Sequence, residues 1–194
     1  MKIKIAENIK MLRKQHSFTQ EQLAEGKWIM DILTQKRITD NGDGRGYFRN
    51  CIAYGYKEKQ EPGEALIETK GYGVSDTNEE HTYEQMYAVK EYFGKTGDNP
   101  VIHFVVSYDK NTVYDADTAC AYTEKIAGYF KDQYQMLTAV HQENQGNSLY
   151  HAHIIMNTVD YNNGRLYHSG IRELQYLSMH INLVTGNYCK AYIK

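Results

Sequence analysis

Alternating apolar and polar positions predict an antiparallel hairpin in the second half of the chain. The two alternating runs cover residues 135–143 and 149–157, and the NQGNS between them contains the Gly, Asn and Ser typical of short hairpin loops. Because a strand sends alternate side chains to opposite faces, His151 and His153 share one face and the apolar residues around them share the other. If NQGNS is the whole loop, His141 lies directly opposite His151, and His153 lies on the diagonal.

The rest of the pattern predicts helices and strands in mixed order. Residues 101–108 are largely apolar on both faces, as expected of a central strand covered by helices. Asn163-Gly164 predicts a tight turn, followed by a short strand. Helices are predicted at 47–56, 79–93, 115–131 and 171–181, and a further strand at 65–70. These elements give an α+β fold with a central antiparallel sheet and flanking helices.

The N-terminal segment differs from the rest in pattern and charge. Helical spacing predicts a helix at 6–16, and Thr19 followed by Gln22 predicts the start of a second helix. Residues 1–37 hold eight Lys/Arg against four Asp/Glu, a net +4 in a chain of net charge -2. We therefore expect a short helical appendage at 1–38 and a main domain at 39–194.

The segment IAENIKMLRKQHSFTQEQLAE resembles the first two helices of a Cro/repressor-type helix-turn-helix. The chain continues EGKWIMDILTQKR, which lacks the small-residue turn and the polar recognition helix of that family. The resemblance therefore implies an incomplete motif, and we expect an appendage rather than a reader of duplex DNA.

Composition bounds the class of protein. The 194 residues suffice for one well-buried domain. No run of 18 apolar residues occurs and the N-terminus is amphipathic, so we expect no membrane span, no secretory signal and a cytoplasmic location. The three cysteines have no C-x-x-C spacing, which predicts reduced thiols. The 18 tyrosines either pack within the sheet and at the surface or offer rings for base stacking.

Three histidines on one face of a hairpin predict a metal site. Imidazoles from His141, His151 and His153 could reach one divalent ion at about 2.0 to 2.2 Å. Such a site suits several metals and serves hydrolysis, oxygenation or phosphoryl transfer. The alternative is a hairpin with ordinary surface or hydrogen-bonded histidines. Three other histidines are expected to be structural: His81, His103 and His168.

The chain resembles the P-type mobilisation relaxases, a branch of the HUH-type endonucleases that nick DNA at a transfer origin. The resemblance rests on HFVVSYD, TAVHQE and YHAHIIMNTVDYNNGRLYH, preceded by CIAYGYKEK and EQMYAVKEYFGK, in the family's order. It covers residues 47–180. The histidine motif is specific, whereas the tyrosine motif is loose.

The resemblance implies roles for individual residues. His141, His151 and His153 would bind a divalent metal, Mn or Mg first, with Zn, Co or Ni as alternatives. Glu143 would take the family's acidic place, either orienting a ligand histidine or acting as a base. Tyr54 would be the nucleophile, with Tyr56 as its rival. The DNA-binding residues would be Ser107, Asn157 and Tyr56, with Asn157 also supporting the histidine strand.

The function implied is a relaxase that nicks single-stranded DNA through a 5′-phosphotyrosine intermediate, assisted by accessory relaxosome proteins. Two departures from the family matter: many members are much longer, and their tyrosine lies nearer the N-terminus. The chain could therefore be an isolated nuclease module or an inactive DNA-binding protein. A three-histidine metalloenzyme acting on a small molecule is the other alternative.

Overall fold

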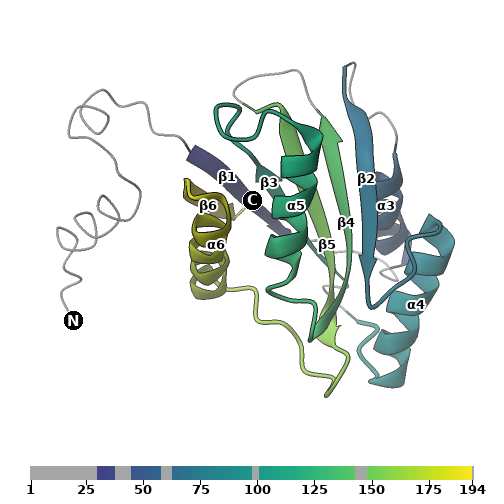
Figure 1. Ribbon diagram of the computed structural model, residues 1–194. Coiled ribbons are helices and arrows are strands. Elements are labelled where there is room, and N and C mark those ends of the chain that lie inside the picture. The colour runs from purple at the N-terminus through teal and green to yellow at the C-terminus, as the bar shows by residue number, and fades with distance from the viewer. Residues whose placement is uncertain (1–29, 38–44, 58–62, 98–100, 143–147, 194) are drawn as a thin grey trace, which may run out of the picture.

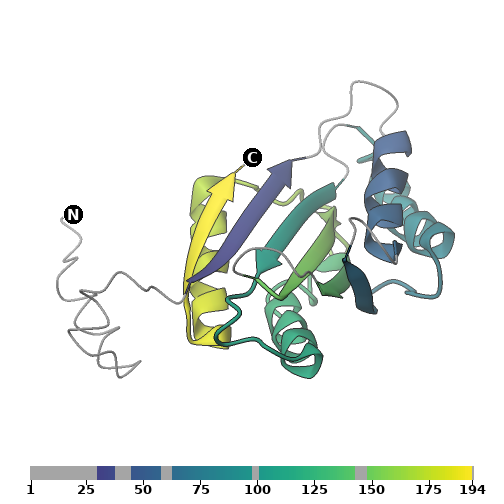
Figure 2. The same ribbon diagram turned by 90° about the horizontal axis from the view of Figure 1, so that it is seen from above.

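In the part of the chain that the structure describes, six strands form one sheet with helices packed on both of its faces (Figure 1). The computed structural model describes residues 30–37, 45–57, 63–97, 101–142 and 148–193. The strand order is β2-β4-β5-β3-β1-β6, and every neighbouring pair is antiparallel except β1 and β6. Figure 2 shows the β1 and β6 arrows running in the same direction. The strands are β1 (Met30–Arg37), β2 (Ala65–Tyr72), β3 (Val101–Ser107), β4 (Tyr134–Gln142), β5 (Tyr150–Asp160) and β6 (Tyr188–Ile193).

Four helices of the described residues flank the sheet, two on each face. Helices α3 (Arg45–Tyr56) and α4 (Glu79–Tyr92) lie toward the β2 end, and α5 (Ala116–Ala127) and α6 (Ile171–Thr185) cover the opposite face (Figures 1 and 2). The side chains of Asn78 and Asp115 cap the starts of α4 and α5. Helix α4 begins at Glu79 as predicted, whereas α5 begins one residue after the predicted start and ends at Ala127 rather than at 131. None of the helices in the described ranges is long and apolar enough to span a membrane.

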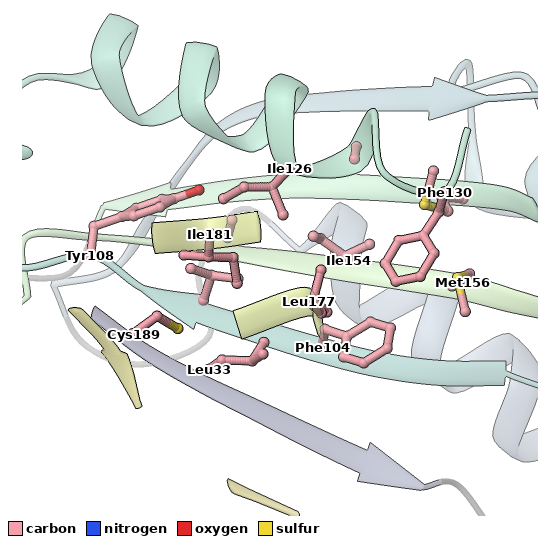
Figure 3. Packing of buried hydrophobic residues seen from close by; sticks show 14 of the residues in the cluster. Leu33, Phe104, Tyr108, Ile126, Phe130, Ile154, Met156, Leu177, Ile181 and Cys189 are labelled. Carbon is pink, nitrogen blue, oxygen red and sulfur yellow. The ribbon is translucent and has the colours of Figure 1, made fainter. Parts of the chain in front are cut away.

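Side chains at alternate positions of the central strands pack into two separate hydrophobic cores, one on each face of the sheet. Phe104 on β3 and Ile154 on β5 point toward α5 and α6, where Ile126 and Leu177 meet them (Figure 3). The smaller core on the other face joins apolar side chains of α3 and α4 to the sheet. This second face also carries the histidines of the hairpin, so α3 packs on the face that holds the candidate site.

Strand β1 corrects the expected domain boundary. Residues 30–37 were expected to belong to the helical appendage, but they pair with β3 and β6 inside the sheet. The physical reason is polar burial: Asp31 and Gln35 point inward beside Leu33, so the apolar alternation of a strand is interrupted. Asp31 accepts hydrogen bonds from the Asp109 backbone N–H at 2.9 Å and from Asn187 Nδ2 at 3.0 Å. Residues 1–29, including the helix-turn-helix resemblance, lie outside the described residues.

The C-terminal end of the chain also differs from the prediction. Helix α6 runs to Thr185, beyond the expected end at 181, and stops at Gly186, whose left-handed backbone (φ 78°) favours glycine. Strand β6 then follows, which the apolar pattern did not predict. The short strand expected after Asn163-Gly164 is reduced to an isolated bridge between Val159 and Leu166.

Candidate metal and tyrosine site

The three hairpin histidines converge as the alternation predicts. His141 on β4 pairs directly with His151 on β5, and His153 pairs with Ala139. The three ring centroids lie 4.8 to 5.4 Å from one another, and all three side chains are buried. The predicted register is confirmed, and it brings three imidazoles to one point beneath α3.

Glu64 is the acidic residue that the described structure brings to this cluster. Its Oε1 lies 3.0 Å from His151 Nε2 and 3.4 Å from His141 Nδ1, and its side chain is buried. Glu64 stands just before β2, whose register places Leu66 opposite His141. Sequence reasoning missed Glu64 because only the β2–β4 pairing, which the sequence pattern did not specify, brings it there. Glu143, the expected acidic group, lies outside the described residues.

The donor set of this cluster fits a divalent metal ion. One potential ligand atom from each of Glu64, His141, His151 and His153 lies within 4.8 Å of the others. His141 Nε2 and His153 Nε2 are buried and have no hydrogen-bond partner among the described residues. Buried nitrogens of this kind are costly unless they bind something, and a metal would satisfy both.

Burial keeps these imidazoles in the form that binds metals. It lowers the pKa of His151 to about 4, lowers that of His141, and lowers that of His153 well below the ordinary value. In each case loss of solvent penalises the charged ring, and the neighbouring histidines add to the effect at His151 and His153. The rings are therefore neutral near pH 7, with lone pairs available to a cation.

Helix α3 brings Tyr54, and not Tyr56, against the histidines. The Tyr54 ring meets the His153 ring edge-on with centroids 5.0 Å apart, and the His103 ring at 5.7 Å. The Tyr56 hydroxyl is instead hydrogen-bonded to Thr82 Oγ1 of α4 at 2.7 Å. Burial raises the pKa of Tyr56, which makes its phenolate harder to form. Geometry therefore distinguishes two tyrosines that the sequence left as rivals.

The two remaining predicted residues have different surroundings. Ser107 on β3 pairs with His151, so its half-buried side chain shares the histidine face. Asn157 is fully buried, and its Nδ2 donates to Met86 O and to Gln135 Oε1, both at 3.0 Å. The Asn157 amide is therefore used inside the protein, and its contact with DNA stays a prediction. It ties β5 to α4, in keeping with the expected support of the histidine strand.

Comparison with known proteins identifies the family of this fold. Residues 54–184 match the family model described as "Relaxase: MobA/VirD2-like, nuclease domain". No curated protein gives a significant match. A solved structure described as "Molecular Basis of Vancomycin Resistance Transfer in Staphylococcus aureus" is similar, with a TM-score of 0.54 and 10% identity over 80% of this chain and 90% of that chain. At this identity the similarity concerns the fold. Since the family model covers more than half of the sequence, the chain belongs to the MobA/VirD2-like relaxases and contains their nuclease domain.

Proposed function

We propose that this chain nicks single-stranded DNA at a transfer origin, with Tyr54 as nucleophile and a divalent metal held beside it. The observation that carries the proposal is the packing of the Tyr54 ring on His153, one member of the buried Glu64 and three-histidine cluster. A nucleophile beside a metal-binding cluster is the arrangement that phosphoryl transfer needs.

His141, His151 and His153 would hold the metal, and Glu64 would complete its ligands. When bound, the ion would neutralise charge on a non-bridging phosphate oxygen and favour the phenolate of the nucleophile. The three imidazoles suit Zn, Co or Ni and the carboxylate suits Mn, whereas Mg is bound through oxygen ligands and water. We therefore propose Mn²⁺ as the first ion to test.

The chemical step is a transesterification. The Tyr54 phenol oxygen forms a bond to the phosphorus, and the bond from phosphorus to the 3′-oxygen of the preceding nucleotide breaks. The products are a 5′-phosphotyrosine and a free 3′-hydroxyl, which takes up a proton in place of the one that the phenol loses. One ester replaces another, so the same step in reverse rejoins the strand.

The exposed half of the histidine face offers a surface for the strand beside the nick. On β6 the side chains of this face are solvent-exposed, and on β1 they are exposed or half-buried. They follow in register from the cluster: His151 pairs with Ser107, Ser107 with Ile32, and Ile32 with Lys190. Tyr188 and Tyr192 flank Lys190 and are 49% and 41% exposed. Exposed rings and ammonium groups suit bases and phosphates, which supports a single-stranded partner. Accessory relaxosome proteins are proposed from the family alone.

The test is covalent trapping on a labelled origin oligonucleotide with Mn²⁺. Wild-type protein should give an adduct that survives denaturing electrophoresis and disappears when the metal is chelated. Tyr54→Phe should abolish it, because the nucleophilic oxygen is gone. Tyr56→Phe is the matched control and should retain the adduct, since the Tyr56 hydroxyl is hydrogen-bonded to Thr82 and does not contact the histidines.

Two outcomes would contradict the proposal. If the adduct persists in Tyr54→Phe and is lost in Tyr56→Phe, the nucleophile is wrong. If the protein binds metal but gives no adduct with either strand of the origin, a metalloenzyme for small molecules or an inactive DNA-binding protein is favoured instead.

A further inference from the structure

His103, on the central strand β3, makes a direct contact with one histidine of the cluster. Its Nε2 lies 2.8 Å from His153 Nδ1, and both side chains are buried. The register explains the contact: Val105 pairs with His153, and His103, two residues earlier, points to the same face on the diagonal. His103 does not belong to the group of residues whose ligand atoms converge.

The two nitrogens of the His153 ring have different surroundings. Nδ1 is engaged by His103, whereas Nε2 is buried without a hydrogen-bond partner among the described residues. A neutral imidazole has one N–H and one lone pair, and a metal needs the lone pair. If Nε2 supplies it, the proton must sit on Nδ1 and be donated to His103 Nε2. His103 then carries its own proton on Nδ1.

We propose that His103 is a positioning residue: it accepts a hydrogen bond from His153 Nδ1–H and holds that ring with its Nε2 lone pair toward the cluster. The inference rests on the proposed three-histidine metal site. Histidine ligands usually donate their second N–H to a carboxylate, a backbone carbonyl or water. Here the acceptor is an uncharged imidazole, which fixes the tautomer without adding negative charge.

The same ring also adjoins the proposed nucleophile. The Tyr54 ring packs edge-on against both His103 and His153. His103 therefore lies beside the ligand and the tyrosine together, and loss of its acceptor would act first on the metal and then on the alignment of Tyr54.

The experiment compares Mn²⁺ and Co²⁺ binding to the full chain by calorimetry. His103→Leu removes the acceptor, and we expect the dissociation constant to rise about 10- to 100-fold, the usual effect of losing such a partner. His103→Gln keeps an acceptor oxygen near the position of Nε2 and should restore most of the affinity. His81→Leu, which removes an exposed histidine on α4, should bind as the wild type does. Unchanged affinity in His103→Leu would overturn the inference.

A second measurement on the metal-free wild type keeps the test independent of folding in the variants. Long-range ¹H–¹⁵N NMR spectra should show His153 protonated at Nδ1 and unprotonated at Nε2. Protonation at Nε2 instead would overturn the inference. Failure of the proposed metal site is distinguishable, because the wild type itself would then bind neither ion.

Discussion

Gly55 determines how closely α3 can approach the sheet. A Cβ at this position would lie 3.0 Å from Leu137 Cδ2 and 3.2 Å from Ile155 Cδ1, both on the histidine face. Contacts this short require the neighbouring side chains to move. The glycine therefore lets the turn that carries Tyr54 lie against the histidine strands.

Replacement of Gly55 by alanine should push α3 away from the sheet and so move Tyr54 away from the histidine cluster. We expect Gly55→Ala to slow adduct formation and to lower the free energy of unfolding by about 1 to 3 kcal/mol through overpacking. Gly46→Ala in the same helix is the control, because its Cβ would meet nothing within 4 Å. Single-turnover trapping and chemical denaturation measure the two effects. Equal rates for both variants would contradict this role.

A substitution at Glu64 tests whether its carboxylate binds the metal ion. Glu64→Gln keeps the shape but removes the charge, so Mn²⁺ affinity should fall by at least about tenfold if the carboxylate binds the ion. Glu68→Gln on β2, an exposed position, is the control. Should Glu64→Gln lose adduct formation with full metal affinity, Glu64 would be a base and not a ligand.

The histidine register could be predicted because it is local, whereas Glu64 and His103 could not be assigned. Strand alternation and a five-residue loop are enough to set His141 opposite His151. The contacts of Glu64 and His103 depend on how β2 pairs with β4 and β3 with β5, and neither pairing is encoded in local spacing. His103 was accordingly expected to be an ordinary structural histidine.

At the scale of elements, strand β1 and the edge strand β6 beside it were not predicted. The inward positions of β1 mix the polar Asp31 and Gln35 with the apolar Leu33. Asp31 is tolerated there because Asp109 and Asn187 donate hydrogen bonds to it from distant parts of the chain. The central strand β3 was predicted because it is largely apolar on both faces, and the hairpin strands because their side chains alternate with a period of two.

The exposed side chains of β6 lead to a prediction about DNA. The double variant Lys190→Glu, Tyr192→Ala should weaken binding of a labelled single strand by about tenfold, since a stacked base is worth about 1 to 3 kcal/mol. High salt should reduce the part of this loss that comes from the Lys190 charge, but not the part that comes from the Tyr192 ring. Lys125→Glu, Tyr129→Ala, on the side of α5, removes a comparable pair from the opposite face. Fluorescence anisotropy measures both, and equal affinities would exclude this surface.

At the scale of the whole molecule, the larger hydrophobic core and the candidate metal site lie on opposite faces of the sheet. The larger core lies under α5 and α6, while the face beneath α3 contains buried histidines and a carboxylate whose role is not packing. Lys90 of α4 is another buried ionisable group, and it belongs neither to the larger core nor to the histidine cluster. Its Nζ donates a hydrogen bond to Thr158 Oγ1 at 2.9 Å.

Lys90 gives the fold a measurable pH dependence. Burial lowers its pKa from 10.5 to about 8, so between these values the unfolded chain binds more protons than the folded one. Stability therefore rises with pH across this window, by up to about 3 kcal/mol from this group. Lys90→Met should remove that rise, and Lys125→Met, an exposed change, is the control. Denaturation at several pH values tests it, and parallel profiles for wild type and Lys90→Met would disprove it.

The central claim is that Tyr54 attacks DNA beside the histidine cluster, and peptide mapping of the trapped wild-type adduct tests it most directly. Trypsin releases residues 50–57 as one peptide containing both Tyr54 and Tyr56, so fragment ions must locate the nucleotide. We predict a metal-dependent 5′-phosphonucleotide on Tyr54. A nucleotide on Tyr56 or on any other residue, or no adduct in the presence of Mn²⁺, would contradict the account.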